Sequence, residues 1–455
     1  MGTSVRLDYR FNADVTSIER DGDRITLDIA NWRPLGFTPR TAALADAVMA
    51  LAGPGAPRDR LVAIASGAEA AFDYYIERFA RGRLLAWTIA DEAGELARVD
   101  ALASRWRPRS DAPPSGDLHL CRFAYLRRDG GGVVLDSGLA RARVVLAPRG
   151  LAALAELLAT PRPATPGGLA ESLWRTGFLD LAHPDESEAR RCWEFHDLLM
   201  HEASRNNRDA TTIGGVYRFE GQFASAPAIK PTMDGERIAL APVDPAGIRQ
   251  RSESLDAVQA RRQSIRHFAQ EAISVKALAE FLWRVCRTTG HQPSGQQAII
   301  SRPYPAGGSI NELEFYLAVR RCDGLAPALY HYDSHGHVLV RIAGSEAIAD
   351  RIVDRSAVAM GLGPDDQKPD LVIVIASRLP RLAWKYQGMA YRASLMNAGV
   401  VFNLMYLVAI DMGLAPCANG TGDSRQLEEA TGLDSFTETA IAEFALSLPA
   451  RRVTS

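Results

Sequence analysis

The sequence predicts an α+β protein with more than one domain. Amphipathic helical segments alternate with short apolar strands along the chain, and 455 residues exceed what one compact core usually holds. A proline-rich break at residues 107–116 and an irregular stretch further on separate regions of different character. We therefore predict two small N-terminal modules at residues 1–106 and 117–206, a linker at 207–254, and a larger C-terminal domain at 255–455.

The first module combines a hairpin with two helices. Residues 12–30 alternate apolar and polar side chains around Asp-Gly-Asp at 21–23, a pattern typical of a hairpin. Helical periodicity follows at 41–53, with Thr41 as the N-cap, and again at 68–82. The second of these helices leads straight into the apolar strand LLAWTIAD. Helices followed by a two-stranded flap are typical of a winged-helix module.

A similar order recurs in the second module. A hairpin is expected around the glycines at 130–132, followed by a helix that begins near Pro148. Residues 166–181 and 186–205 supply further helical pattern. We therefore predict a second winged-helix-like module.

The C-terminal domain has the strongest apolar segments. An amphipathic helix is expected at 274–290, with Ser274 as its N-cap. Residues 312–320 and 371–378 are nearly continuous in apolar side chains, as strands buried inside a sheet are. Residues 388–413 are hydrophobic around most of a helical circumference, which predicts a central and fully buried helix.

Composition excludes several classes of protein. Lys and Arg number 52 against 54 Asp and Glu, so the net charge of -2 leaves no excess for sequence-blind nucleic-acid binding. The longest apolar runs fall short of the roughly 20 residues that cross a bilayer, and the first residues show no apolar signal segment. We expect no membrane span and a cytoplasmic location.

The cysteines and histidines do not form a metal-binding pattern. Five cysteines stand far apart without a CxxC spacing, which disfavours a disulfide framework or a structural zinc and suggests buried thiols in a reducing compartment. His331, His335 and His337 lie where two strands joined by an Asp-Ser-His-Gly turn are expected. We therefore predict no metal site.

Three segments concentrate unusual residues in a chain that has neither a GxGxxG, a GxxxxGK[ST] nor a GxSxG motif. In the first, Arg262, Ser264 and Arg266 stand at alternate positions, so an extended strand would point all three the same way. Two guanidinium groups and a hydroxyl make an anion site for a phosphate or an electron-rich ring edge. The alternative is a solvated basic stretch.

The second segment is a proline- and glycine-rich loop at residues 301–309. A rigid Pro-x-Pro leads into Gly307 and Gly308, and glycine lets backbone approach a flat ligand because it has no Cβ. An ordinary loop between strands explains the composition equally well.

The third segment contains Lys385 and Tyr386, which we expect in a loop between the strand at 371–378 and the long apolar helix. Neighbouring residues cannot share a helix face, but in a loop both can turn toward one pocket. Desolvation lowers the pKa of an amine and a nearby cation lowers that of a phenol, so such a pair can remove a weakly acidic proton. The alternative is a snorkelling lysine beside an interfacial tyrosine.

The three segments together resemble one family. RxSxR, RPYPxGG and KYxxxxYR are followed by a long helix that ends in GLxxCAxGxxD, and the resemblance covers about 255–450. This order resembles the SagB-type dehydrogenases, or thiazoline oxidases, of the nitroreductase superfamily. Residues 193–205 are similar to the segment that precedes the catalytic domain in longer members, whose N-terminal portions are winged-helix-like. The implied fold of 255–455 is a nitroreductase-like FMN fold, a central sheet wrapped by helices.

The resemblance implies an FMN-dependent enzyme that dehydrogenates thiazoline or oxazoline rings in a peptide or carrier-bound intermediate to thiazole or oxazole. Lys385 and Tyr386 match the family's catalytic pair. Ala306 and Asn397 depart from it, since members often have serine and glutamate there. The implied cofactor contacts are Arg262, Ser264, Arg266, Pro305, Ala306, Gly307, Gly308, Ser309, Asn403, Gly420 and Asp423.

The resemblance also implies a homodimer with FMN at the subunit interface, centred on the apolar helix, and a cyclodehydratase or synthetase as partner. Two other functions remain open from the residues alone. One is a general NAD(P)H-dependent FMN nitro- or quinone reductase, and the other is a non-catalytic peptide-binding partner with the same fold.

Overall fold

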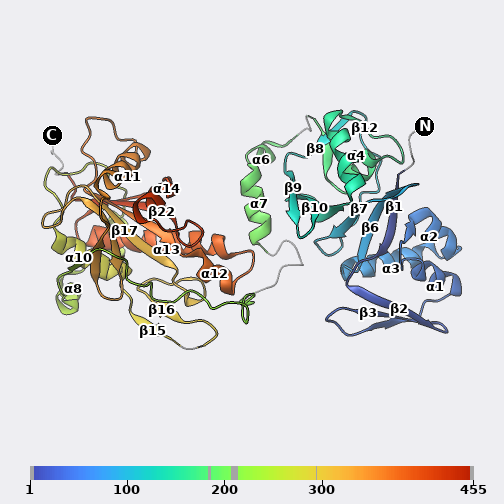
Figure 1. Cartoon of the computed structure of the whole chain (residues 1–455), viewed down its shortest axis with the longest axis horizontal. Coiled ribbons are helices and arrows are strands. Elements are labelled where there is room, and N and C mark those ends of the chain that lie inside the picture. The colour runs from blue at the N-terminus through green and yellow to red at the C-terminus, as the bar shows by residue number, and fades with distance from the viewer. Residues whose placement is uncertain (1–4, 183–185, 206–213, 294, 451–455) are drawn as a thin grey trace. The chain divides into compact units, whose positions relative to one another are not determined.

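The chain divides into two compact units, residues 1–212 and 213–455. The computed structural model describes residues 5–182, 186–205, 214–293 and 295–450. Figure 1 shows both units, with the first in blue to green and the second in yellow-green to red.

Among its described residues, the first unit contains one seven-stranded sheet and two three-stranded sheets, one of which is formed by β2, β3 and β4. Its strands are β1 (Arg6–Phe11), β2 (Val15–Asp21), β3 (Arg24–Ile29), β4 (Leu35–Phe37), β5 (Ala56–Pro57), β6 (Leu85–Asp91), β7 (Gly94–Ala101), β8 (Asp117–Leu120), β9 (Ala124–Asp129), β10 (Gly132–Ser137), β11 (Ala142–Leu146), β12 (Arg162–Pro163) and β13 (Leu179–Leu181). Its helices are α1 (Ala42–Met49), α2 (Arg58–Ala65), α3 (Glu69–Arg81), α4 (Pro148–Ala159), α5 (Leu169–Arg175), α6 (Glu188–Arg191) and α7 (Phe195–Ser204).

Most of the predicted local elements of this unit are present, but the helix expected over 166–181 ends at Arg175 and Leu179–Leu181 form the strand β13. β2 and β3 form the expected hairpin. Thr41 caps α1 by accepting a hydrogen bond from the amide of Leu44. The predicted modules 1–106 and 117–206 share one sheet, because β7 of the first pairs with β11 of the second in the order β5-β1-β6-β7-β11-β10-β9. That the modules are winged helices stays a prediction.

The second unit is built on a seven-stranded antiparallel sheet in the order β14-β19-β18-β17-β20-β22-β21. Its strands are β14 (Glu236–Ala239), β15 (Gly290–Gln292), β16 (Ile299–Ser301), β17 (Leu313–Val319), β18 (Ala328–Asp333), β19 (Val338–Arg341), β20 (Leu371–Ser377), β21 (Ala415–Asn419) and β22 (Thr439–Ser447). Its helices are α8 (Pro245–Arg251), α9 (Leu255–Arg261), α10 (Val275–Cys286), α11 (Glu346–Ala359), α12 (Leu379–Lys385), α13 (Ala390–Asp411) and α14 (Ser424–Thr431), with a 3₁₀ turn η1 (Gly307–Ser309).

Helices cover both faces of this sheet. Phe315 and Ile373 point to one side, where they join a core with α10 and α13, while Tyr316 and Val374 point to the other side, where α11 lies. Side chains alternate across a strand, so a sheet covered on both faces needs apolar residues at every position. This explains why β17, apart from Glu314, and β20 are nearly continuous in apolar residues, all of which are buried.

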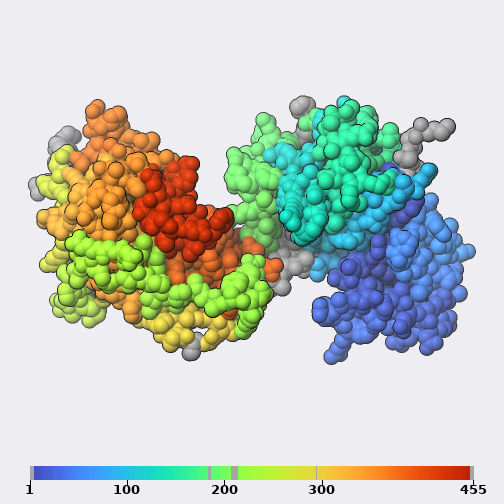
Figure 2. Space-filling view, in the orientation of Figure 1, coloured from blue at the N-terminus to red at the C-terminus, as the bar shows by residue number. Residues whose placement is uncertain are grey.

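The predicted linker is wrong for the part that the structure describes. Residues 236–239 form β14, which pairs with β19 at the edge of the main sheet. The rest of 214–254 runs over the surface of the second unit in yellow-green (Figure 2). Proline and glycine made this stretch look like a connection, but its backbone is held by contacts with residues far away in the sequence.

The prediction that residues 388–413 form a fully buried helix is also wrong. α13 contacts the sheet and α10, yet Met396 is 61% exposed and Val400 and Asn403 lie on the same outer face. Of the described residues, only α13 is long and apolar enough to cross a membrane by length and composition, and half of its most apolar stretch is buried in the unit. Its apolar circumference therefore reflects one packed face and one apolar face that remains open.

Candidate functional site

Lys385 and Tyr386 lie at the end of a helix and not in the expected loop. Lys385 is the last residue of α12, and Tyr386 is its C-cap in an extended conformation. The Tyr386 amide still donates to the Leu382 carbonyl at 2.7 Å, so the helix holds the pair until the chain bends. The change of backbone direction at Tyr386 lets two adjacent side chains reach the same place, which a continuing helix would not allow.

That place is the 3₁₀ turn at Gly307–Ser309. The Lys385 amine donates to the Gly308 carbonyl at 3.3 Å and lies 5.4 Å from the centre of the Tyr386 ring. A Cβ at Gly308 would stand 2.1 Å from the Tyr386 hydroxyl and 2.7 Å from the Lys385 amine. Gly308 also has a positive φ of 59°. Only glycine therefore allows the amine and the phenol to approach this backbone.

A buried polar cluster holds the turn at Gly307–Ser309 in place. The Gly307 amide donates to the side-chain oxygen of Asn397 at 3.0 Å. The Asn397 amide group in turn donates to both oxygens of Glu312, which is fully buried and also accepts from Ser394. Asn397, one of the departures from the family pattern, therefore anchors the loop beside the Lys-Tyr pair. Glu312 carries no local sequence signal, because only the fold brings it to α13.

Arg262, Ser264 and Arg266 of the RxSxR motif form part of a second cluster, which we call the arginine cluster. Residues 262–267 run as an irregular extended segment beside β21, where the Ile265 amide donates to the Pro416 carbonyl at 2.9 Å. The Ser264 and Tyr406 hydroxyls are 2.7 Å apart, and the Arg262 guanidinium lies 5.4 Å from the Tyr406 ring centre.

Arg266 completes this cluster beside Cys417. Burial raises the pKa of the Cys417 thiol, and the nearby Arg266 opposes that rise. Arg262 and Arg266 are both exposed, and within the described ranges neither pairs with a carboxylate. Two unpaired guanidinium groups on one side of a chain segment form a site for an anion.

The two clusters lie at different levels along α13. Asn397 is hydrogen-bonded to the turn of the Lys-Tyr cluster, and Tyr406 is hydrogen-bonded to Ser264 of the arginine cluster. Nine residues separate Asn397 from Tyr406. At 1.5 Å per residue, this corresponds to roughly 14 Å along the helix axis. Pro305 and Ala306 lead into the turn at Gly307, while Asn403 faces outward between the two clusters.

The remaining predicted cofactor residues lie near the N-terminal end of α14. Asp423 is the N-cap of α14 and also pairs with Arg425, which lowers the pKa of its carboxyl to about 2. Gly420 and Asp423 border a cavity of about 140 Å³ that Tyr391 and Glu443 also line. The carboxylate of Asp423 is therefore already bound to the N-terminus of α14 and to Arg425.

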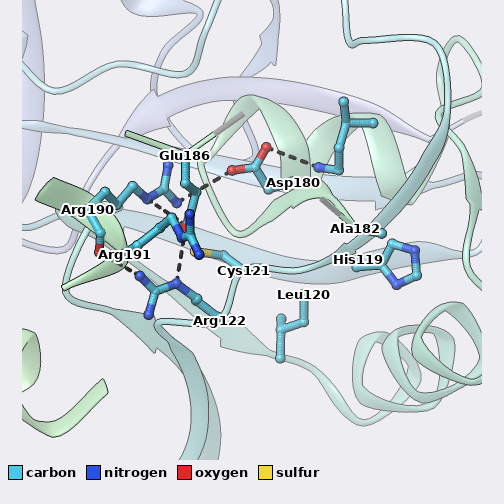
Figure 3. A pocket seen from close by; sticks show the side chains of 10 residues that line it. His119, Leu120, Cys121, Arg122, Asp180, Ala182, Glu186, Arg190 and Arg191 are labelled. Carbon is cyan, nitrogen blue, oxygen red and sulfur yellow. Dashed lines mark hydrogen bonds and ion pairs between the residues drawn. The ribbon is translucent and has the colours of Figure 1, made fainter. Parts of the chain in front are cut away.

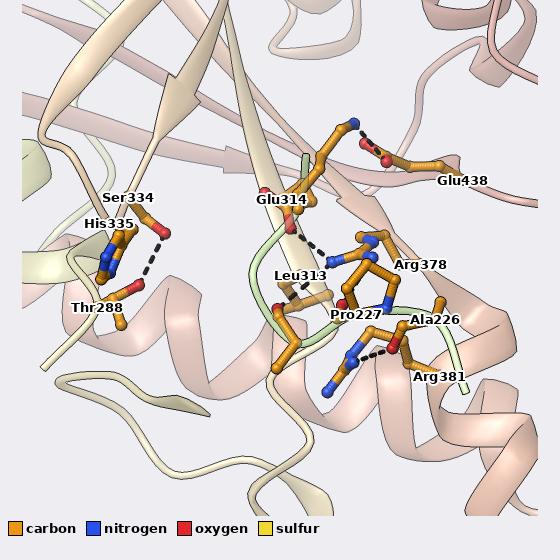
Figure 4. A network of polar contacts seen from close by, with 12 residues as sticks. Ala226, Pro227, Thr288, Leu313, Glu314, Ser334, His335, Arg378, Arg381 and Glu438 are labelled. Carbon is orange, nitrogen blue, oxygen red and sulfur yellow. Dashed lines mark hydrogen bonds and ion pairs between the residues drawn. The ribbon is translucent and has the colours of Figure 1, made fainter. Parts of the chain in front are cut away.

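Behind the site, a buried charge network joins distant segments (Figure 4). Arg381 is fully buried and donates to the carbonyls of Ala226, Ala298 and Ile310. Glu314 pairs with His331 and Arg378, and these partners overcome the effect of burial and lower the pKa of its carboxyl to about 2. The sequence gives no signal for this network, because its members come from separate elements.

A cleft of about 400 Å³ in the first unit contains none of the predicted site residues (Figure 3). Arg122 and Arg190 both pair with Glu186, and Arg190 also lies 3.6 Å from Asp180. Arg191 also lines this cleft, and the site residues predicted from the sequence all lie in the second unit.

The residues of the second unit fit a flavin mononucleotide. Arg262, Ser264 and Arg266 supply cations and a hydroxyl for a phosphate and a ring edge. The turn at Gly307–Ser309 presents backbone without a Cβ at the position nearest the amine and the phenol.

Two families match this chain. Residues 260–445 match the Nitroreductase family, and residues 118–210 match the cyanobactin oxidase ThcOx family. A putative nitroreductase of Methanocaldococcus jannaschii is 23% identical over 176 residues, which cover 38% of this chain and 82% of that protein.

Solved structures that align with this chain include the following two. A putative nitroreductase from Ralstonia eutropha aligns with a TM-score of 0.38 and 20% identity, over 50% of this chain and 100% of that one. A chain of the E. coli microcin synthetase McbBCD complex with truncated pro-MccB17 bound aligns with a TM-score of 0.34 and 19% identity, over 52% of this chain and 91% of that one.

The nitroreductase match covers most of the sheet, though not its edge strand β14, together with α13 and both residue clusters, and the cyanobactin oxidase match lies in the unit before it. Nitroreductases are typically flavin-binding proteins. Together with the order of motifs along the chain, these matches show a nitroreductase-family region at residues 260–445 that follows a region similar to a cyanobactin oxidase at 118–210.

Proposed function

We propose that this protein is an FMN-dependent dehydrogenase that converts thiazoline or oxazoline rings of a peptide substrate into thiazole or oxazole. The observation that carries the proposal is the convergence of the Lys385 amine and the Tyr386 phenol on the Gly308 backbone. A simple flavin reductase has no need of an amine and a phenol held together at this turn.

The chemistry requires the loss of two hydrogens from the ring. One leaves a carbon as a proton and the other leaves the neighbouring carbon as a hydride, after which the ring is aromatic. Bound FMN would supply the hydride acceptor. Lys385 or Tyr386 removes the proton, and a well-placed general base contributes about 10²–10⁴-fold to such a step.

Arg262, Ser264 and Arg266 would hold the phosphate and the ring edge of FMN. The turn from Pro305 through Ala306 to Ser309 would line the flavin. Asn403, Gly420 and Asp423 would lie further out around the cofactor.

A homodimer would bring the arginine cluster of one copy close to the Lys-Tyr cluster of the other. The open face of α13 carries Met396 and Val400, and Met389 lies at its N-cap; these large apolar side chains are 61%, 39% and 36% exposed. Exposed apolar patches of this kind mark interaction surfaces. If two copies pack through α13 in opposite directions, the arginine cluster of one copy approaches the Gly308 turn of the other, so each flavin would contact both subunits.

The match of residues 118–210 to a cyanobactin oxidase supports a peptide as the substrate. The first unit would then bind the peptide, and a cyclodehydratase or synthetase that forms the azoline would be the partner. A carrier-bound intermediate would present the same ring to the same residues.

Two measurements on the purified full-length protein test this proposal. Its absorption spectrum should show oxidised flavin, and an azoline-containing peptide should bleach that flavin under anaerobic conditions faster than NADPH does. Rapid bleaching by NADPH alone would instead favour a general nitro- or quinone reductase. The absence of flavin would favour a non-catalytic peptide-binding protein.

A further inference from the structure

Residues 214–228, which we call the strap, cross over the helix that carries the catalytic lysine. The amides of Val216 and Tyr217 both donate to the Lys385 carbonyl, at 2.8 and 3.2 Å. Further along the strap, the indole of Trp384 donates to the Phe223 carbonyl at 3.0 Å, and Arg381 donates to the Ala226 carbonyl. The strap is therefore attached to α12 at both ends.

Gly215 brings the strap backbone against the side chain of Lys385. A Cβ at Gly215 would stand 3.1 Å from Cε and 3.3 Å from Cγ of that lysine. Both distances are shorter than ordinary carbon contacts of about 3.5–4.0 Å. The aliphatic stem of Lys385 thus has the strap on one side, and any larger residue at position 215 would push it away.

Tyr217 adopts a backbone conformation that its side chain does not favour. Its φ is +47°, in the left-handed region that bulky residues rarely occupy. The conformation is fixed by the hydrogen bond from its amide to Lys385 and by edge-to-face contact of its ring with Trp384, whose centre is 5.8 Å away. Strained residues of this kind persist where the surroundings determine them, and they are frequent at functional sites.

The result is that two aromatic rings and one carbonyl surround the Lys385 amine. The ring centre of Tyr217 lies 5.8 Å from the nitrogen, that of Tyr386 lies 5.4 Å from it, and the Gly308 oxygen lies 3.3 Å from it. Aromatic faces within about 6 Å attract a cationic amine. Of these three groups, only Tyr217 comes from the strap.

We propose that Tyr217 is a positioning residue, which holds the Lys385 amine against the Gly308 turn so that it can reach the ring carbon of the substrate. This inference rests on the proposed function, in which Lys385 takes part in proton removal. Tyr217 acts through Lys385 and is itself no catalytic residue.

The test compares Tyr217→Gly with Tyr217→Phe in the full-length, FMN-loaded protein. Glycine removes the ring but tolerates the positive φ, so the variant should still fold. We expect it to reduce the maximal rate of anaerobic flavin bleaching by an azoline peptide by about 10–100-fold, as misplaced catalytic groups do. The substrate concentration for half-maximal rate and the flavin content should stay the same, and Tyr217→Phe should restore the rate.

A second readout is independent of the flavin and of activity. Limited labelling with an amine-reactive reagent, read by mass spectrometry, reports how freely the Lys385 amine moves. Exposed Lys276 on α10 serves as the internal reference. We expect Lys385 to be labelled several-fold faster relative to Lys276 in Tyr217→Gly, while Tyr217→Phe labels like the native protein. Gly215→Ala, which displaces the lysine stem, should also change the Lys385 labelling rate.

The outcomes separate this inference from the proposed function. Equal labelling of Lys385 and equal bleaching rates in the native protein and in Tyr217→Gly would overturn the positioning role, even if Lys385→Ala is inactive. Failure of the native protein to bind flavin or to be bleached by an azoline peptide would overturn the proposed function. The labelling result would still decide whether Tyr217 holds the amine.

Discussion

At the scale of single residues, the site depends on contacts that only one side chain can make. Gly308 leaves room for the amine and the phenol, and Asn397 holds the amide next to it. Ala306 and Asn397 differ from the residues that family members often have, yet the turn is held through Glu312. The turn beside the Lys-Tyr pair is thus held in place although these two side chains differ.

Replacing Lys385 with alanine should separate cofactor binding from proton removal. Because the amine does not belong to the arginine cluster, the Lys385→Ala variant should keep its FMN. Its rate of anaerobic flavin bleaching by an azoline peptide should fall by about 10²–10⁴-fold. Stopped-flow absorbance measures this rate, with Lys276→Ala as the control that should bleach normally. An unchanged rate in Lys385→Ala would remove the lysine from the mechanism.

Replacing Arg262 with alanine should release the cofactor. Arg262 has no carboxylate partner among the described residues, so its charge is free to hold a phosphate. The neighbouring Arg261 is a matched control, because it is exposed and pairs with Glu253. We expect purified Arg262→Ala to be colourless and Arg261→Ala to be yellow. A fully yellow Arg262→Ala variant would refute the phosphate assignment.

Glu443 should make the stability of the second unit depend on pH. Burial raises the pKa of its carboxyl to about 7 from the usual 4.5, against hydrogen bonds from Ser356 and Asn419. Between these two values the unfolded chain releases the proton while the folded protein keeps it, so this group lowers stability as pH rises and its effect levels off above about pH 7.

Glu443→Gln removes that titration. Denaturant unfolding should show the variant gaining stability relative to the native protein between about pH 5 and about pH 8, by at most about 3 kcal/mol. Glu428→Gln, at an exposed position of α14, is the matched control for the chemical change. Parallel pH profiles for the native protein and Glu443→Gln would contradict the shifted pKa.

At the scale of elements, α12 connects the site with the body of the second unit. Its last residue is Lys385, while Arg381 one turn earlier binds three backbone carbonyls from separate segments. Burial and the neighbouring Arg378 lower the pKa of Arg381 to about 10. The strap, the 3₁₀ turn and the helix therefore share one anchor.

Arg381→Met should reveal this anchor. Methionine fills a similar volume but leaves three carbonyls without their donor, and each buried unsatisfied group costs about 1–3 kcal/mol. We expect the second unit to lose about 3 kcal/mol or more in denaturant unfolding. The control is Arg351→Met. Arg351 is exposed and pairs with Glu429, and loss of a surface pair changes stability by about 1 kcal/mol or less. Equal stability of the two variants would show that Arg381 is no anchor.

At the scale of the whole molecule, the open face of α13 is the feature that a single chain does not explain. Met396→Glu would place a charge in the proposed subunit interface. Sedimentation should then show a monomer, and flavin content should fall, because each flavin would contact both copies. Val358→Glu, on an apolar residue of α11 that is even more exposed than Met396, should leave the dimer intact. A dimeric and fully yellow Met396→Glu would place the interface elsewhere.

The sequence predicts much of this architecture because its signals are local. The caps at Thr41 and Ser274 and the apolar runs of β17 and β20 depend on nearby residues. The strand β14, the pairing of β7 with β11, and the contacts of Glu312 and Tyr217 depend on residues far away in the chain. These long-range contacts follow from the topology, so no local pattern predicts them. The sequence does not predict the open face of α13, because an exposed apolar face has the same composition as a buried one.

The most direct test of the central claim is a single turnover without oxygen. The full-length protein is mixed with an azoline-containing peptide, and flavin absorbance and peptide mass are followed together. We predict that the flavin is bleached in step with the loss of two hydrogens from the peptide, one ring for each flavin. A flavin that stays oxidised while the peptide keeps its mass would contradict the claim that this site oxidises azolines.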